Sequence, residues 1–312
     1  MRIPHHRRIV QGRTRRWPRF LSRWLLGLVI ILGVPLYFAA ELSSSAYTAS
    51  SPLSILARLY EKPSPLRWPA AHRGDQAYGH ENSLPAIRGA AQAGVPLIEI
   101  DVRRNADGSL FLFHDGHLDA GKLIASHELG GRRVESLRNH ELRSVRYPGT
   151  VPAGIATYAE ALEAIKPYRT ALQLDVRGES LAVIDQAVHI ARDMGQTHQI
   201  VIQCQRLSTL ASVRERYPDI AVLVRSHSIA DVRKAYRKLP DIIQIDADWI
   251  TPELVQEIHA AGSKILVKSL YVMDTTEHWD QLFNAGIDIL LTDKAVHMVR
   301  FLRAPQRLND TP

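Results

Sequence analysis

The chain has 312 residues, of which 46% are hydrophobic and 23% charged, so it can bury one large core or two smaller ones. Its net charge of +7 arises in the first 50 residues, which contain eight arginines and a single glutamate. The remaining 31 basic and 31 acidic residues balance, which argues against a nucleic-acid-binding protein.

Residues 24–40, "WLLGLVIILGVPLYFAA", carry no charge and approach the ~20 apolar residues that cross a bilayer. The arginines before them favour a cytoplasmic N-terminus. We therefore predict a basic cytoplasmic tail at 1–23 and a single-pass transmembrane signal anchor at 24–41. This anchor would lie in the inner (plasma) membrane, with the folded domain on its periplasmic or extracellular side. The alternative is a cleaved signal peptide, because the small residues "SSSA" at 43–46 suit signal peptidase.

Residues 42–66 are rich in serine and proline and are predicted to form a tether that includes a short helix. The chain has one cysteine, Cys204, so no intramolecular disulfide can form. The sequence offers no base that would activate its thiol, and we predict that Cys204 packs in the core.

Residues 67–312 alternate short apolar runs of strand length with segments of helical spacing. Helical periodicity follows most of the runs, as in "SLPAIRGAAQAG" and "TPELVQEIHAAG". Eight strands alternating with helices over about 240 residues predict an α/β fold of the (β/α)8 TIM barrel type. A doubly wound open sheet is the alternative, although no glycine-rich phosphate loop follows a strand. The predicted strands are "AAHRG", "LIEID", "ALQLD", "IVIQC", "AVLVR", "IIQID", "KILVK" and "ILLTD".

One further apolar run, "SLFLFHD", follows the second strand after only the turn "RNADG". A parallel strand would need a crossover of a dozen or more residues, so this run is predicted to return antiparallel. Asp107 and Gly108 are residues that tight hairpin turns favour. The predicted barrel therefore has a β-hairpin and an insertion after strand two, and the hairpin would bring His114 to the level of Glu99 and Asp101.

Glu99 and Asp101 lie two residues apart, so they share one face of the second strand with Arg103. In a barrel the apolar face packs on the helices, which turns these carboxylates inward. Two buried carboxylates repel each other unless a cation lies between them, and their oxygens suit Mg²⁺ or Ca²⁺. The sequence thus predicts half of a divalent-metal site. The alternative is a buried salt bridge from either carboxylate to Arg103 or Arg73.

Other strand ends direct polar side chains toward the same rim. "AHRG" ends the first strand with His72 and Arg73, and "LQLDVR" ends the third with Asp175 and Arg177. With His114, this set suits a phosphodiester substrate. A metal and Arg73 would neutralise the nonbridging oxygens, and two imidazoles would exchange protons with the nucleophile and the leaving group.

The ordered series "AHRG", "HENS", "EID" and "ADGSLFLFHD", closed by "AGIDILLTD", resembles the glycerophosphodiester phosphodiesterase family. This family belongs to the phospholipase C-like phosphodiesterase barrels. The resemblance implies a metal-dependent enzyme that cleaves a phosphodiester to glycerol phosphate and an alcohol. By position it implies that His72 and His114 are the acid–base pair and that Arg73 contacts phosphate. It also implies three metal ligands, namely Glu99, Asp101 and Asp175.

Strand three and strand seven depart from the family pattern. The third strand reads "DVR" where the family usually has Glu-Ile-Lys, so Asp175 is one methylene shorter and Arg177 presents a planar fork. Lys268 stands where the family has an aromatic residue, which favours a more anionic head group. We predict that Arg177, Lys268 and Asn82 bind substrate with Arg73. An alternative role for Asn82 is to support the turn before the next helix.

The predicted function is metal-dependent hydrolysis of a glycerophosphodiester or a lysophospholipid by two histidines at the C-terminal face of the barrel. One alternative is a phospholipase of the phosphatidylinositol phospholipase C or sphingomyelinase D type, which would release a cyclic phosphate. Another is a catalytically inactive barrel that binds phospholipid. The predicted cofactor is Mg²⁺ or Ca²⁺. The predicted partners are the phosphodiester or phospholipid substrate and, through the N-terminal helix, the membrane.

Overall fold

The computed structural model describes residues 54–304 apart from 120, 122 and 150–152. The predicted tail at 1–23 and signal anchor at 24–41 lie outside the described residues. Among the residues that are described, no helix is long and apolar enough to cross a lipid bilayer.

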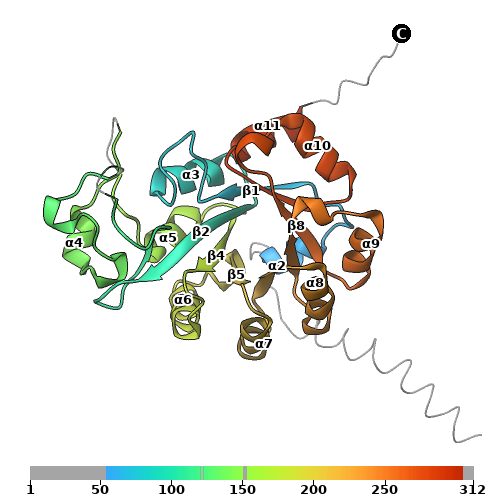
Figure 1. The fold of residues 1–312 in the computed structure, drawn as a ribbon, viewed down its shortest axis with the longest axis horizontal. Helices are drawn as coiled ribbons and strands as arrows, with labels where there is room; N and C mark the ends of the chain where they lie inside the picture. The colour runs from blue at the N-terminus through green and yellow to red at the C-terminus, as the bar shows by residue number, and fades with distance from the viewer. Residues whose placement is uncertain (1–53, 120, 122, 150–152, 305–312) are drawn as a thin grey trace, which may run out of the picture. The chain divides into compact units, whose positions relative to one another are not determined.

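Eight parallel strands form a closed barrel, and Figure 1 shows helices arranged around the outside of the strands. The barrel closes because β1 pairs in parallel with both β2 and β9. This closure excludes the doubly wound open sheet and confirms the predicted (β/α)8 barrel with all eight of its strands. The strands are β1 Trp68–His72, β2 Leu97–Arg104, β3 Leu110–Leu112, β4 Ala171–Val176, β5 Ile200–Cys204, β6 Ala221–Arg225, β7 Ile242–Ile245, β8 Lys264–Lys268 and β9 Ile289–Thr292.

Helices connect successive strands, and short 3₁₀ turns lie in several of the loops. The α-helices are α2 Ile55–Tyr60, α3 Leu84–Gln92, α4 Asn139–Ser144, α5 Tyr158–Ile165, α6 Leu181–Asp193, α7 Leu207–Arg216, α8 Ile229–Ala235, α9 Pro252–Ala260, α10 Thr276–Asn284 and α11 Ala295–Arg303. The 3₁₀ turns are η1 His127–Leu129, η2 Val134–Ser136, η3 Thr197–Gln199, η4 Tyr236–Lys238, η5 Ala247–Trp249 and η6 Tyr271–Met273.

The hairpin and insertion after the second barrel strand are present as predicted. β3 pairs antiparallel with β2, with Val102 opposite Leu112. Gly108 in the turn has a φ of 82°, a left-handed conformation that glycine adopts without a steric penalty. The insertion between β3 and α5 has its own apolar cluster, which includes Phe111, Val134 and Leu137. The hairpin is therefore packed on both sides and holds the residues that follow it in place.

Side chains along the barrel strands alternate between the inward and the outward face, as the sequence predicts. On β2, Ile98 and Ile100 face outward and pack in the same cluster as Ile87 of α3. Leu97 faces inward and belongs to the cluster that fills the opposite end of the barrel from the strand carboxyl ends. Further along the same inward face, toward the carboxyl end of β2, lie Glu99 and Asp101.

Helix α2 closes the end of the barrel where the strands begin. Its buried residues Ile55 and Leu59 cluster with Leu97 and the other inward residues of that end. Full burial of one such side chain contributes roughly 1.5–3 kcal/mol. Ser54 caps the helix by accepting a hydrogen bond from the Ala57 amide at 3.0 Å. Helix α2 lies within the predicted tether at 42–66 and packs as part of the barrel.

Candidate active site

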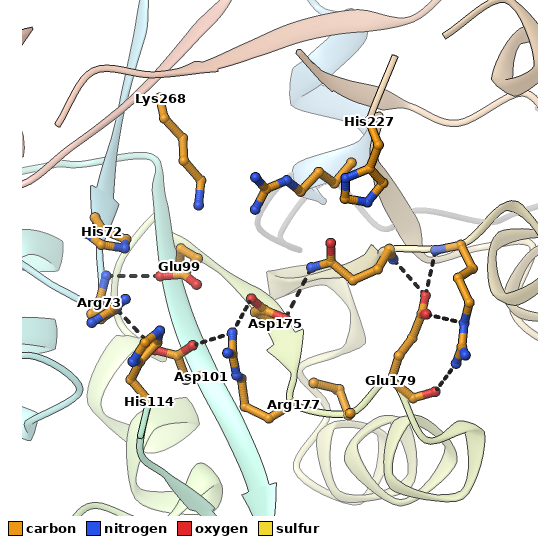
Figure 2. Close-up of a pocket in the computed structure, with 15 residues that line it drawn as sticks. His72, Arg73, Glu99, Asp101, His114, Asp175, Arg177, Glu179, His227 and Lys268 are labelled. Atoms are coloured by element: carbon orange, nitrogen blue, oxygen red, sulfur yellow. Dashed lines mark hydrogen bonds and ion pairs between the residues drawn. The ribbon is translucent and has the colours of Figure 1, made fainter. Parts of the chain in front are cut away.

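A pocket of about 620 Å³ opens at the carboxyl ends of the strands. Figure 2 shows its labelled side chains converging from several strands. Eight of the nine site residues predicted from the sequence line this pocket, whereas Asn82 lies beneath it. Those eight are His72, Arg73, Glu99, Asp101, His114, Asp175, Arg177 and Lys268.

Three buried carboxylates from β2 and β4 form the centre of the pocket. Asp101 and Asp175 are register partners on these strands, and Glu99 lies two residues before Asp101. One oxygen of each carboxylate lies within 4.8 Å of the others. Burial raises the pKa of Glu99 well above its ordinary value, and the charges of Asp101 and Asp175 raise it further. A divalent cation would relieve this repulsion, so the donor set fits a hard metal ion.

The carboxylates differ in how many cationic side chains lie beside them. Asp101 lies 3.2 Å from Arg73 Nε and 3.4 Å from Arg177 Nη1. Glu99 accepts a hydrogen bond only from the backbone amide of Arg73, at 3.1 Å, among the described residues. The salt-bridge alternative therefore holds for Asp101 with Arg73 and fails for Glu99.

Arg103 is the other cation that the sequence offered as a salt-bridge partner, and it points elsewhere. Its guanidinium donates to the backbone oxygens of Phe113 at 2.9 Å and His114 at 2.6 Å. It also forms an ion pair with Glu135 of the insertion. Arg103 thus fixes the end of the hairpin and with it the position of His114.

Asn82 supports Asp101 instead of lining the pocket. Its side chain is fully buried, donates to Asp101 Oδ2 at 2.9 Å, and accepts from the Asp101 amide at 3.0 Å. The Asn82 backbone is left-handed, with a φ of 57°, and its amide donates to the Arg73 carbonyl oxygen. Ser83 then caps α3 and Pro85 lies in its first turn. The alternative role predicted for Asn82, to support this turn, matches its position.

The "HRG" turn is shaped by two left-handed residues. Arg73 has a φ of 57°, which turns its amide toward Glu99 and its guanidinium toward Glu81, at 2.6 Å. Gly74 has a φ of 88°, and a β-carbon there would lie 2.8 Å from that of Ala86. Only glycine fits at this position, because α3 passes too close for a side chain.

Each pocket histidine is oriented by a carboxylate. His72 Nδ1 lies 2.8 Å from Asp293 Oδ1, and His114 Nδ1 lies 2.8 Å from Asp115 Oδ1. These contacts leave Nε2 of both rings for the pocket. Neither Asp293 in "ILLTD" nor Asp115 in "FHD" was predicted to have a role. Asp115 could have been identified because it follows His114 directly, whereas Asp293 meets His72 only through the pairing of β9 with β1.

After β4, the third barrel strand, Arg177 stands where the family pattern has a lysine. Arg177 contacts Asp175 at 3.1 Å as well as Asp101, so its guanidinium is bound to two of the three carboxylates. Gln205 reaches Asp175 at 3.5 Å. Cys204 before it is buried, and burial raises the pKa of its thiol to about 12. The prediction that Cys204 is a packing residue is confirmed.

The pocket has a further basic side that was not predicted from the sequence. Arg225, the last residue of β6, and His227 both line it. The signal was present, because "AVLVR" ends in a charged residue at a strand carboxyl end, as the other site strands do.

Glycerophosphodiester phosphodiesterases resemble this chain in sequence, and a phosphodiesterase of known structure resembles it in fold. The chain is 22% identical to a glycerophosphodiester phosphodiesterase of Caldanaerobacter subterraneus, over 75% of this chain and 96% of that protein. It is also 22% identical to one from Arabidopsis thaliana, over 92% and 90% of the two chains. Among solved structures, an Oleispira antarctica phosphodiesterase has the same fold, with a TM-score of 0.63 and 22% identity. That match covers 75% of this chain and 96% of that one.

The family match covers the barrel almost from end to end. The model of the "Glycerophosphoryl diester phosphodiesterase family" matches residues 72–297, so it begins at the first pocket histidine and ends in α11. Because this match spans well over half of the sequence, the chain belongs to the glycerophosphoryl diester phosphodiesterase family and is a phosphoric diester hydrolase.

Proposed function

We propose that this protein hydrolyses a glycerophosphodiester with a divalent cation, Mg²⁺ or Ca²⁺, and with His72 and His114 as the acid–base pair. The observation that carries the proposal is the shared pocket. Two histidines, each held by a carboxylate through Nδ1, line the same cavity as three buried carboxylates, of which Glu99 has a strongly raised pKa because of burial and the charges of Asp101 and Asp175. This pairing of proton-transfer groups with a cation site suits cleavage of a charged phosphodiester.

The cation would be held by Glu99, Asp101 and Asp175. When bound, it supplies positive charge to the nonbridging phosphate oxygens. Asn82 fixes the orientation of Asp101, and the Arg73 amide fixes Glu99. The protein's own contribution is thus a rigid set of oxygens whose mutual repulsion is removed when the cation binds.

The histidines would move the protons. One imidazole Nε2 takes the proton of the nucleophile, either a substrate hydroxyl next to the ester or a water molecule. A new bond then forms from that oxygen to phosphorus, and the bond from phosphorus to the alcohol oxygen breaks. The other imidazole donates a proton to the departing alcohol oxygen. If the hydroxyl is the nucleophile, the first product is a cyclic phosphate, and a water molecule must then open the ring to complete hydrolysis. Diesters without a neighbouring hydroxyl will not react by this route.

The substrate class is supported by relatives and by the sequence. The Oleispira antarctica phosphodiesterase was solved in complex with the product sn-glycerol-3-phosphate, which suggests a glycerophosphodiester for this chain. The apolar segment at 24–41 leads us to propose a location at the plasma membrane with the barrel outside the cytoplasm, where lysophospholipids are accessible. A soluble glycerophosphodiester fits the same chemistry.

The test measures alcohol release by the full chain from glycerophosphodiesters and lysophospholipids, with Mg²⁺ or Ca²⁺ and after chelation. We expect turnover that requires the cation and is lost in His72→Ala, His114→Ala and Glu99→Gln. His127→Ala is the matched control, because His127 is exposed in the insertion. A cyclic phosphate as final product would favour the phospholipase alternative. Binding without turnover would favour the inactive barrel.

A further inference from the structure

One wall of the pocket carries two cations that form no ion pair with the described residues. Arg225 on β6 and Lys268 on β8 both line the cavity, with His227 at the rim. Around the closed barrel β6 lies opposite β1, and β8 lies opposite β4. Figure 2 shows Lys268 and His227 on the side of the pocket away from Asp101 and Asp175. The two cations therefore lie across the cavity from the carboxylates.

Arg225 and Lys268 differ from the other cations of the site. Arg73, Arg177 and Arg206 each form an ion pair with a carboxylate. Among the described residues, the side chains of Arg225 and Lys268 form neither a hydrogen bond nor an ion pair within the distances that define one. Half-buried cations without a counter-ion are costly, because they lose hydration without gaining an opposite charge.

At longer range the carboxylate of Glu99 attracts Lys268, but Glu99 is also a candidate metal ligand. Figure 2 shows Lys268 pointing toward Glu99. Burial lowers the pKa of Lys268, the carboxylate of Glu99 opposes this effect, and the charge of Arg225 adds to it. A cation on Glu99 would cancel that attraction, which would leave Arg225 and Lys268 facing each other without compensation.

The charges that line the pocket show which cations lack a negative partner. Of the five basic side chains that line it, Arg73, Arg177 and Arg206 are each paired with a carboxylate, whereas Arg225 and Lys268 form no ion pair among the described residues. The uncompensated positive charge therefore lies on the wall formed by Arg225 and Lys268, away from the candidate metal ligands.

We propose that Arg225, Lys268 and His227 form an anion subsite for a second negatively charged group, a carboxylate or a phosphate, on the alcohol half of the phosphodiester. This inference rests on the proposed function, since it assumes that the scissile phosphate lies beside the carboxylates. The preferred substrate is then a glycerophosphodiester with an acidic head group, in place of a neutral or cationic one.

The experiment compares two ligands that differ by one carboxylate, sn-glycero-3-phosphoserine and sn-glycero-3-phosphoethanolamine. Binding is measured by calorimetry in the full chain with His114→Ala and Mg²⁺, and kcat/KM is measured in the wild type. We expect the serine diester to bind roughly tenfold or more tightly, because charge-assisted hydrogen bonds hold its carboxylate. Arg225→Gln and Lys268→Gln should each bring the ratio of the two affinities toward one.

Arg206→Gln is the matched control, because Arg206 lines the same pocket but is paired with Glu179 at 2.6 Å. It should leave the ratio unchanged, and melting temperatures verify that each variant is folded. Equal binding of both diesters would overturn the subsite, as would an equal loss of both in Arg225→Gln, which would assign the arginine to the scissile phosphate. Absence of turnover with the binding preference intact would overturn the proposed function and leave the subsite supported.

A second pair of ligands identifies the anion. Glycerophosphoinositol 4-phosphate and glycerophosphoinositol differ by one phosphate monoester. A larger preference in this pair than in the serine pair would assign the subsite to phosphate, and the reverse would assign it to carboxylate. No preference in either pair would contradict the proposal.

Discussion

Buried carboxylates occur at both ends of the barrel, and their surroundings are opposite. At the closed end Asp288 is fully buried and accepts hydrogen bonds from the Leu66 amide, the Ile265 amide and His259 Nε2, at 3.1, 2.9 and 2.8 Å. Burial alone would raise the pKa of Asp288, but these donors hold it below its ordinary value. At the open end Glu99 has one amide donor and a strongly raised pKa.

The difference separates two uses of the same chemical group. A carboxylate that is saturated with donors ties segments together, and in Asp288 it joins the chain before β1 to β8 and α9. A carboxylate crowded by others stores electrostatic repulsion in the metal-free protein. Among the described residues, the carboxylate cluster that carries this repulsion lies at the end of the barrel where a cation could remove it.

The largest effect is expected for Glu99→Gln, which removes charge from the crowded end. Changing a residue that only supports a metal ligand costs roughly 10- to 100-fold, so loss of a ligand should lower kcat/KM by more than about 100-fold. The same change should raise the melting temperature of the metal-free protein, because it relieves repulsion with Asp101 and Asp175. Glu128→Gln, at an exposed position, is the control. A lower melting temperature would show that Glu99 is structural.

Asp288→Ala should have the opposite effect, a loss of stability with little change in activity. Removing a buried carboxylate leaves three donors without an acceptor, and we expect the free energy of unfolding to fall by about 3 kcal/mol in urea denaturation. The kcat/KM of the molecules that remain folded should stay near that of the wild type. Asp219→Ala, at an exposed position, provides the comparison. A large loss of activity without a loss of stability would contradict the division between the two ends.

Asp293→Asn tests a carboxylate at the open end that does have a partner. Asp293 holds His72, whose side chain is 7% exposed, whereas Asp115 and His114 are 43% and 31% exposed. Because solvent screens the second pair, we expect a loss of kcat/KM of roughly 10- to 100-fold for Asp293→Asn and less for Asp115→Asn. The pH profile of kcat/KM should change with Asp293→Asn. Equal effects of the two substitutions would remove burial as the reason.

The stability of the metal-free protein should also depend on pH. The pKa of Glu99 is raised in the folded state, so folded Glu99 keeps its proton after unfolded Glu99 has lost it. Its contribution to stability is therefore present below the unfolded pKa and is lost as pH rises through the folded pKa. The loss is roughly 1.4 kcal/mol for each pH unit that separates the two pKa values. Thermal denaturation from about pH 4 to about pH 8 measures this loss, which Mg²⁺ or Glu99→Gln should reduce.

Much of the fold follows from local sequence, because strand and helix periodicities are short-range patterns. The hairpin was also predictable, since "RNADG" is too short for a crossover. Helix α2 was assigned to a tether because serine and proline flank it, and only tertiary packing reveals that Leu59 is buried.

The site was predictable where a strand end carries charge next to a recognisable motif. It was not predictable where two residues far apart in sequence make one contact, as His72 and Asp293 do. The same limit applies to Asn82, whose two bonds to Asp101 depend on the left-handed turn before α3. The charge of Arg225 at the end of "AVLVR" is visible in the sequence, but its place opposite β1 follows only from barrel closure.

The burial of Cys204 gives this protein a practical property. It is the only cysteine in the chain, it is inaccessible to solvent, and its thiol remains protonated at neutral pH. A maleimide dye should therefore leave the folded protein unlabelled. Val272, which is 87% exposed on the loop after β8, could be changed to cysteine and labelled at that one position. A fluorophore there would mark the loop after β8, whose strand supplies Lys268 to the pocket, without removing any native thiol.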